Sequence, residues 1–167
     1  MNWINILISE YSERYNKNGW ILIRSMLCYY RDPDFRVVTL IRYATNGNCD
    51  YLRKKCVKKL LLKYSVAISR RCRIGKSFHP AHYLGLVIGP GVIIGDNCIT
   101  YQQVTLGQKG GLYPTLVNNV TVYTGAKIIG DVHIGNNVSI GANAVVLQDV
   151  PDNCIAVGIP ARIIEKG

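Results

Sequence analysis

The chain has 167 residues, a formal net charge of +10 and 49% hydrophobic residues, enough for one domain with a buried core. No apolar stretch of about 18 residues occurs, so no membrane-spanning helix is expected. The N-terminal residues contain neither a basic leader nor a cleavage site, so we expect no signal peptide. The six cysteines form no CxxC pair, which favours a reduced, cytoplasmic setting.

Residues 1–65 are predicted to form a helical N-terminal segment. Apolar residues recur at helical spacing in two runs separated by Gly19. The predicted faces are Trp3, Ile4, Leu7, Ile8 and Tyr11 in the first run, and Ile21, Leu22, Ser25, Met26 and Tyr29 in the second. Asp32-Pro33-Asp34 predicts the start of a third helix, because Pro is tolerated in a first turn and Asp favours caps. Asn46-Gly47-Asn48 predicts its end, and a basic helix is expected to follow to about Tyr64.

The excess of positive charge lies in the N-terminal part of the chain. Residues 1–75 hold fifteen of the twenty Lys and Arg and five of the ten Asp and Glu, so the remainder of the chain is neutral. The plainer interpretation is the solvated face of an amphipathic helix. The sharper hypothesis is a peripheral contact with anionic lipid head groups at the inner face of a membrane, or with a polyanionic substrate. Nucleic acid is not expected, because no known reading motif accompanies the charge.

From residue 88 onward the chain repeats every six residues. The first repeated position is apolar or Thr and skips once, between Leu106 and Leu116; its members are Ile88, Ile94, Thr100, Leu106, Leu116, Val122, Ile128, Ile134, Ile140 and Val146. The second lies four residues later and carries small or β-branched side chains: Val92, Cys98, Val104, Val120, Ala126, Val132, Val138, Ala144 and Val150. Neither a helical nor an alternating period explains this pattern. It is typical of a hexapeptide-repeat parallel β-helix.

Strand dimensions explain the repeat. Six residues span about 20 Å, which is one flat side of a prism whose coils pair their backbones with one another. The first repeated position is expected to point inward, while Gly and Asn fill the turns, where they accept backbone angles that strain other residues. The predicted fold is mainly β: residues 66–167 form the β-helix, preceded by the helical segment of residues 1–65.

Two interruptions of the repeat mark where a site could be built. The interval from Ile74 to Ile88 is fourteen residues instead of twelve, so two extra residues bulge within 78–85. The interval from Leu106 to Leu116 is ten residues, so residues 107–115 must leave the wall as an extended loop. Repetitive walls are inert, and departures from them are candidate functional sites.

Several short segments make the chain recognisable. They are Ile74-Gly75-Lys76, His82-x-x-Gly85, residues 85–97, Gln102-Gln103-Val104-Thr105-Leu106-Gly107, residues 141–146 and residues 157–164. Residues 66–164 thereby resemble the hexapeptide-repeat acyltransferases, most closely the serine acetyltransferase branch and its capsular and exopolysaccharide (colanic-acid-type) O-acetyltransferase relatives. The resemblance implies a left-handed β-helix, a homotrimer, and acetyl-coenzyme A bound between neighbouring prisms.

By this resemblance His82 is the catalytic residue, because it aligns without a gap with the family's catalytic histidine. Histidine suits a general base, since its ordinary pKa lies near neutral pH. His79, in the same bulge, is expected to have a supporting or surface role, and His133 to be exposed on the outer wall. The three histidines also raise a zinc-binding hexapeptide-repeat protein as an alternative. The histidine spacing does not match that group, and no metal is expected.

The resemblance also implies cofactor positions. Gln108 aligns with the loop that meets the pantetheine arm of acetyl-coenzyme A, Gly125 and Ala142 with small positions beside that arm, and Arg162 with its nucleotide end. Arg can pair with a phosphate through two parallel hydrogen bonds.

The acceptor is where the chain departs from serine acetyltransferases. The charged positions of that branch correspond here to Ala67, Ala81 and Leu112, and an amino-acid zwitterion needs charged partners. Tyr83, Gln102 and Tyr113 remain as neutral substrate-binding candidates. They favour acetyl transfer to a sugar hydroxyl in capsular or exopolysaccharide biosynthesis. The alternatives are serine O-acetylation, N-acetylation of an amino sugar, and a non-enzymatic scaffold.

Overall fold

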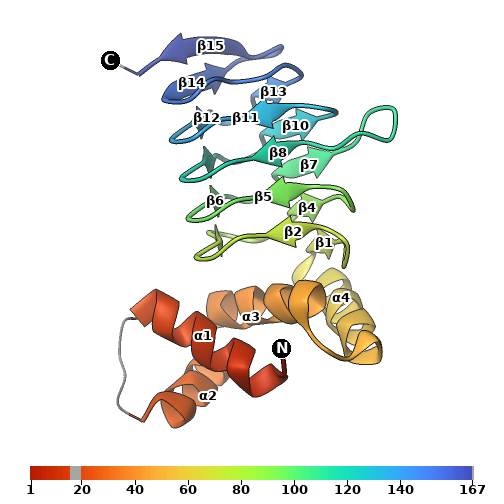
Figure 1. Cartoon of the computed structure of the whole chain (residues 1–167), viewed down its shortest axis with the longest axis vertical. Coiled ribbons are helices and arrows are strands. Elements are labelled where there is room, and N and C mark those ends of the chain that lie inside the picture. Colours follow the sequence, from red (N-terminus) through yellow and green to blue (C-terminus); the bar gives the residue numbers. More distant parts are fainter. Residues whose placement is uncertain (16–19, 167) are drawn as a thin grey trace.

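The computed structural model describes residues 1–15 and 20–166, so Gly19 lies outside the described residues. Within these residues, four helices precede a left-handed parallel β-helix, and β15 (Arg162–Glu165) lies at the end of the prism farthest from the helices (Figure 1). The helices are α1 (Trp3–Tyr15), α2 (Ile21–Arg31), α3 (Pro33–Asn46) and α4 (Asp50–Tyr64). Among the described residues, no helix is both long and apolar enough to cross a membrane.

In the described part of the chain, fifteen short strands form three sheets, one on each side of the prism. The first sheet holds β1 (Ala67–Ile68), β4 (Val87–Ile88), β7 (Thr105–Gly107), β10 (Lys127–Ile129) and β13 (Val145–Val146). The second holds β2 (Arg73–Ile74), β5 (Ile93–Ile94), β8 (Thr115–Leu116) and β11 (His133–Ile134). The third holds β3 (His79–Pro80), β6 (Ile99–Thr100), β9 (Thr121–Val122), β12 (Ser139–Ile140), β14 (Cys154–Val157) and β15 (Arg162–Glu165).

Consecutive strands belong to different sheets, and each strand pairs with its counterpart in the next coil. Val87 pairs with Thr105, for example, and Thr105 with Lys127, in parallel register. Only β15 runs antiparallel to its partner, β14, and it ends the stack. The fold predicted from the hexapeptide repeat is therefore confirmed.

The interior of the prism is built from both repeated positions. The side chains from Ile88 to Val146 at the first position, and from Val92 to Val150 at the second, are all buried, and Cys98 is fully buried among them. The six cysteines are free thiols in the described structure. A single continuous core runs from α3 and α4 through every coil to Ala156 and Ala161. The helices therefore close the first end of the β-helix by sharing its core.

The prism has three corners, which differ in chemistry. The asparagine corner joins the second sheet to the third, and Asn97, Asn119, Asn137 and Asn153 all lie there with φ between 55° and 58°. This left-handed conformation favours Asn, because its short polar side chain tolerates it. The His82 corner (residues 81–86, 101–104, 123–126 and 141–144) joins the third sheet to the first. The loop corner (residues 69–72, 89–92, 108–114 and 130–132) joins the first sheet to the second.

The third and fourth helices begin and end as the sequence predicts. The Asp32 side chain accepts hydrogen bonds from the backbone N–H groups of Asp34 and Phe35, at 2.9 and 3.1 Å, and caps α3, with Pro33 in its first turn. By contrast, the predicted faces of the first two helices were partly wrong. Ile4, Leu22 and Met26 are exposed. Helix α2 instead turns the small Ser25 inward, which lets it pack closely against α1 and α3.

A buried ion pair ties α1 and α3 to the β-helix. The Arg42 Nε atom lies 2.6 Å from Glu10 Oε1, and both side chains are less than a tenth exposed. The Arg42 Nη1 group also donates to the backbone carbonyls of Ile74, at 2.9 Å, and Gly75. Burial raises the pKa of the Glu10 carboxyl, while the Arg42 charge acts in the opposite direction. Arg42 therefore joins two helices and the first coil through one side chain.

Replacing Arg42 with Met should lower the free energy of unfolding by about 3 kcal/mol or more, because the Glu10 carboxylate would stay buried without its partner. Urea unfolding followed by circular dichroism measures this change. Lys54→Met is the matched control: Lys54 pairs with Asp50 at the surface, where the two side chains are 63% and 59% exposed, and should change stability by about 0.5 kcal/mol or less. Equal losses in both variants would contradict a special role for Arg42.

Candidate functional site

The two extra residues after β3 push His82 out of the prism. In later coils the His82 corner is a four-residue turn whose third residue donates its N–H to the previous coil: Gln103 to the Leu84 carbonyl, Gly125 to Gln102, and Asn143 to Thr124. Gly85 takes this position in the first coil and donates to Ser65. His82 therefore lies in the inserted part of the turn, exposed and in a left-handed conformation, with φ of 57°.

Aromatic rings extend from His82 along its corner. The His82 ring lies 6.2 Å from the Tyr101 ring, centroid to centroid, and the Tyr101 ring stacks on that of Tyr123 at 5.3 Å. The structure records no hydrogen bond from either His82 nitrogen to any residue within 1–15 or 20–166. The exposed ring can therefore meet a group outside the chain, and a proton-transferring imidazole needs one free nitrogen for this.

Gln102 and Tyr83, both predicted to bind substrate, belong to the His82 corner but have different surroundings. Gln102 is half-buried on the next coil, and its Oε1 atom is buried without a hydrogen-bond donor among the described residues. A buried polar atom without a partner is uncommon and suits a group that a ligand would satisfy. The Tyr83 ring instead packs edge-on against Tyr64 of α4, at 5.8 Å, and burial raises the pKa of its hydroxyl. This contact gives Tyr83 a structural role beside its predicted one.

The small residues predicted to border the pantetheine arm follow His82 up the same corner. Gly125 has φ of 68°, and a Cβ atom there would lie 2.1 Å from Asn143 Oδ1. Glycine adopts this conformation without strain, but Gln103 and Asn143 hold the equivalent positions of neighbouring coils with φ of 59° and 57°, so the turn alone does not require glycine. Ala142 is exposed on the next coil, and its small methyl group leaves room for a ligand along this corner.

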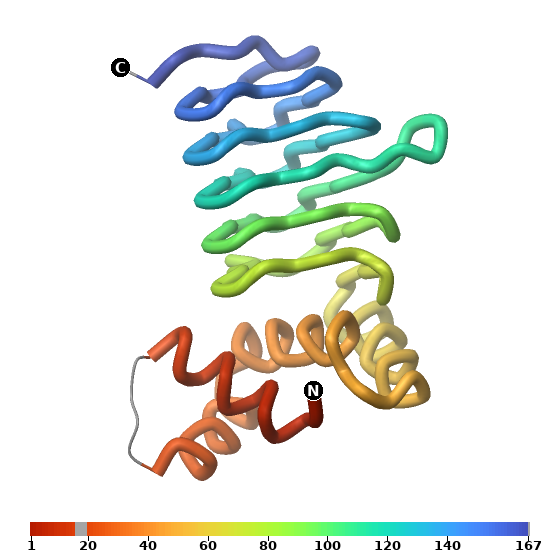
Figure 2. The backbone as a smooth tube through the Cα atoms, in the orientation of Figure 1, coloured from red at the N-terminus to blue at the C-terminus, as the bar shows by residue number. Residues whose placement is uncertain are grey.

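The residues predicted in the extended loop lie on a different corner. The loop projects from the prism between β7 and β8, which confirms the predicted interruption (Figure 2). Gln108 Oε1 accepts a hydrogen bond from the Gly111 N–H at 2.7 Å and so holds the loop tip. The Tyr113 ring lies over Gly89 and Gly91, where an added Cβ atom would come within 2.7 and 2.4 Å of it. Gln108 and Tyr113 thus belong to the loop corner and not to the His82 corner of the same chain.

The remaining predicted cofactor residue, Arg162, is exposed at the start of β15, beyond the last coil. The structure also gives the places of the three uncharged residues that replace charged ones of the serine acetyltransferase branch. Ala67 lies in β1, Ala81 directly before His82, and Leu112 is exposed on the loop. One chain therefore gathers His82, Gln102, Gly125 and Ala142 along one corner. It holds Gln108, Tyr113 and Arg162 elsewhere.

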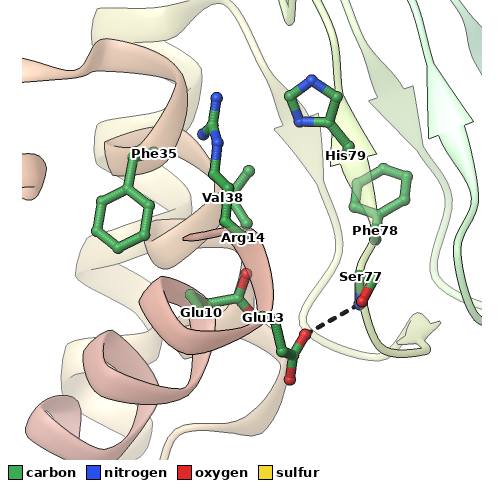
Figure 3. Close-up of a pocket in the computed structure, with 8 residues that line it drawn as sticks. All are labelled: Glu10, Glu13, Arg14, Phe35, Val38, Ser77, Phe78 and His79. Atoms are coloured by element: carbon green, nitrogen blue, oxygen red, sulfur yellow. Dashed lines mark hydrogen bonds between the residues drawn. The ribbon is translucent and has the colours of Figure 1, made fainter. Parts of the chain in front are cut away.

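A pocket that the sequence does not indicate lies between the helices and the first coil (Figure 3). Its volume is about 250 Å³, and it is lined by Glu10, Glu13, Arg14, Phe35, Val38, Ser77, Phe78 and His79. Glu13 closes one side by accepting a hydrogen bond from the Ser77 N–H at 3.0 Å. Burial lowers the pKa of His79, and the positive charge of Arg14 lowers it further. Only the packing of α1 against residues far along the chain creates this pocket.

His133 is exposed on the outer wall, as predicted. Within the described parts of the chain, no three His, Cys, Asp or Glu side chains lie close enough together to hold a metal ion.

Comparisons with known proteins agree with this architecture. The family model described as bacterial transferase hexapeptide (six repeats) matches residues 113–148. A serine acetyltransferase of Synechococcus elongatus is 42% identical over 160 residues, which is 90% of this chain and 62% of that relative. A serine acetyltransferase of Staphylococcus aureus is 43% identical over 132 residues, covering 76% of this chain and 62% of the relative. The chain thus spans less than two thirds of the length of these relatives.

Solved structures are similar over almost the whole chain. A serine acetyltransferase of Brucella abortus in complex with coenzyme A has a TM-score of 0.75 and 26% identity, covering 98% of this chain and 67% of that one. Soybean serine acetyltransferase complexed with serine has a TM-score of 0.76 and 28% identity, covering 95% and 67%. The repeat, the left-handed β-helix and these comparisons together make the chain similar to the hexapeptide-repeat transferases.

Proposed function

We propose that this chain is an acetyl-coenzyme A-dependent O-acetyltransferase in which His82 is the general base, with serine as the acceptor that its relatives favour. The observation that carries the proposal is the exposed imidazole of His82, which an inserted turn projects from an otherwise repetitive wall. Support comes from similar proteins whose structures hold coenzyme A or serine.

The chemistry assigned to His82 has two proton transfers. His82 takes the proton from the acceptor hydroxyl as the hydroxyl oxygen attacks the thioester carbonyl carbon. The tetrahedral intermediate then breaks its carbon–sulfur bond, and the imidazolium returns the proton to the leaving thiolate of coenzyme A. A correctly placed acid–base group of this kind contributes about 10²- to 10⁴-fold in rate. The exposed position of the His82 side chain fits this role.

A site shared between subunits explains why the predicted residues lie on two corners. In the proposed homotrimer, the His82 corner of one subunit faces the loop corner of its neighbour, and acetyl-coenzyme A lies between them. Gly125 and Ala142 border the pantetheine arm on one side, and Gln108 and Tyr113 approach from the other. Arg162, beyond the last coil, is the proposed partner of the nucleotide phosphates. The outward projection of the loop supports this arrangement (Figure 2).

The similarities alone do not identify the acceptor. The relatives described above are serine acetyltransferases, so they favour serine over the sugar that the sequence analysis placed first. One feature favours the sugar as second candidate: Ala67, Ala81 and Leu112 supply no charge near the site. Gln102, with its unsatisfied buried oxygen, could hold a hydroxyl of either acceptor.

His82→Ala should reduce acetyl transfer by about 10²-fold or more, because the acceptor hydroxyl loses its base. Thiol release from acetyl-coenzyme A measures the rate, and light scattering measures the assembly, which should not change. His133→Ala is the matched control, since His133 is exposed on the outer wall and should leave the rate unchanged. Full activity in His82→Ala would remove the assignment.

Ala81→Asp should raise kcat/KM for serine about tenfold or more, because a carboxylate beside His82 could accept a charge-assisted hydrogen bond from the serine ammonium group. Thiol release is measured with serine, amino sugars and capsular oligosaccharides, for the parent and the variant. Serine turnover by the parent supports the first candidate. Turnover of a saccharide with none of serine would replace it by the second.

Co-expression of His82→Ala and Tyr113→Ala chains should restore acetyl transfer that each variant loses alone. In a mixed trimer some sites combine the intact His82 corner of one subunit with the intact loop corner of another. The rate per trimer, measured after purification with two different tags, should rise well above the mean of the two single variants. No recovery would indicate that each site lies within one chain.

A further inference from the structure

Helix α2 carries its large apolar side chains on the outside of the molecule. Within the described chain its only buried residue is Ser25. The exposed side chains form what we call the α2 stripe: Trp20, Leu22, Ile23, Met26, Leu27 and Tyr30. They are substantially exposed, from 40% for Leu22 to 77% for Trp20. Scattered apolar residues on a surface need no explanation, whereas a contiguous patch marks an interaction site.

Helical geometry shows that the stripe is one face. At about 100° per residue, the side chains from Leu22 to Tyr30 fall within an arc of about 140°, which is the width of a typical apolar helix face. Arg24 and Arg31 border this arc on one side, and the α2 sequence contains no Asp or Glu. The helix lies at the end of the molecule away from the C-terminus (Figure 1).

Helix α4 supplies cations beside the stripe. Lys54, Lys55, Lys58, Lys59 and Lys63 are all exposed. The Lys59 Nζ atom lies 6.0 Å from the ring centre of Tyr29 in α2, so Lys59 reaches the edge of α2 opposite its arginines. A cleft of about 250 Å³ joins the two helices there and is lined by Tyr29, Leu52, Lys55, Lys59 and four further residues. The apolar face is thus continuous with a basic one.

Four of the five acidic residues of the helical segment are already engaged, and the fifth is Asp34. Glu10 pairs with Arg42, and Glu13 binds the Ser77 N–H. Asp32 caps α3, and Asp50 contacts Lys54 and Arg70. The lysines of α4 other than Lys54 have no carboxylate within 4.0 Å among the described residues, so their charge faces outward.

We propose that the α2 stripe and the lysines of α4 dock this chain on an anionic phospholipid surface. Aliphatic and aromatic side chains bordered by cations are the features with which an amphipathic helix lies in the head-group layer. A second copy of the chain would bring two strongly basic segments together. A nucleic acid would neutralise the lysines but leave Leu22, Ile23 and Leu27 in water. Anionic lipid alone satisfies both parts of the surface, and this holds whatever the acceptor of the enzyme is.

Co-sedimentation of the full chain with vesicles tests the proposal. One set of vesicles contains phosphatidylcholine with about one third phosphatidylglycerol, and the other contains phosphatidylcholine alone. At low salt the chain should bind the anionic vesicles at least about tenfold more tightly, and high salt should weaken that binding. Failure to bind anionic vesicles at low salt, or equal binding to both sets, would overturn the proposal.

Ile23→Asp with Leu27→Asp should reduce the binding at least about tenfold, because two charges would enter the apolar layer. The matched control is Leu147→Asp with Ile164→Asp, which adds the same charge at exposed apolar positions of the β-helix and should bind nearly as the parent does. Circular dichroism verifies the fold of both. Equal losses in the two variants would show that net charge alone drives binding, and a smaller assembly in the α2 variant would show that a second copy covers the stripe. Either result overturns the proposal.

Discussion

The pairing of each coil with the coils above and below is the constraint on which the rest of the structure depends. Because the backbone groups of strands such as β4, β7 and β10 satisfy one another in register, every coil must repeat the same inward positions. An inward side chain cannot be altered without disturbing its stack. The two most prominent departures from the wall therefore occur where extra residues leave the register, in the turn with His82 and the loop with Gln108. The regular turns of later coils can add only side chains that point outward, such as those of Gln102 and Ala142.

This constraint also explains what the sequence could predict. A six-residue period identifies the inward positions directly, so the core from Ile88 to Val146 and both interruptions follow from the sequence alone. The buried faces of α1 and α2 do not follow from the sequence alone, because the neighbouring helices determine which face is buried. Here α2 buries Ser25 and exposes Met26. Tyr83 is predicted to bind substrate, and its ring also packs against Tyr64, which lies nineteen positions earlier in the chain and becomes its neighbour only after folding. Contacts of this kind depend on how the helices close the prism, and no local pattern encodes them.

The helical segment and the β-helix form one physical unit, although their sequences are of different kinds. Arg42 reaches from α3 to the carbonyls of the first coil, and α3 and α4 complete the core at that end. An open end of a β-helix would leave backbone groups and apolar side chains in water. Closing it with helices frees their opposite faces for other uses. The charge distribution follows from this division, since residues that pack against the prism are neutral or paired, while those on the far side are basic.

The two proposed surfaces bear on each other through the position of His82. It belongs, with Tyr83, to the coil directly next to the helices, and strands in neighbouring coils are only about 5 Å apart. Helix α2 packs on α1 and α3, so if α2 rests on a lipid surface, His82 would lie about two helix diameters, roughly 20 Å, from that surface. A freely diffusing amino acid gains nothing from that proximity, whereas an acceptor held at the membrane would be concentrated there. The neutral residues Ala67, Ala81 and Leu112 are compatible with such an acceptor, which is the second candidate, whereas the similar proteins favour serine. The lipid docking proposed for the α2 stripe does not depend on which acceptor is used.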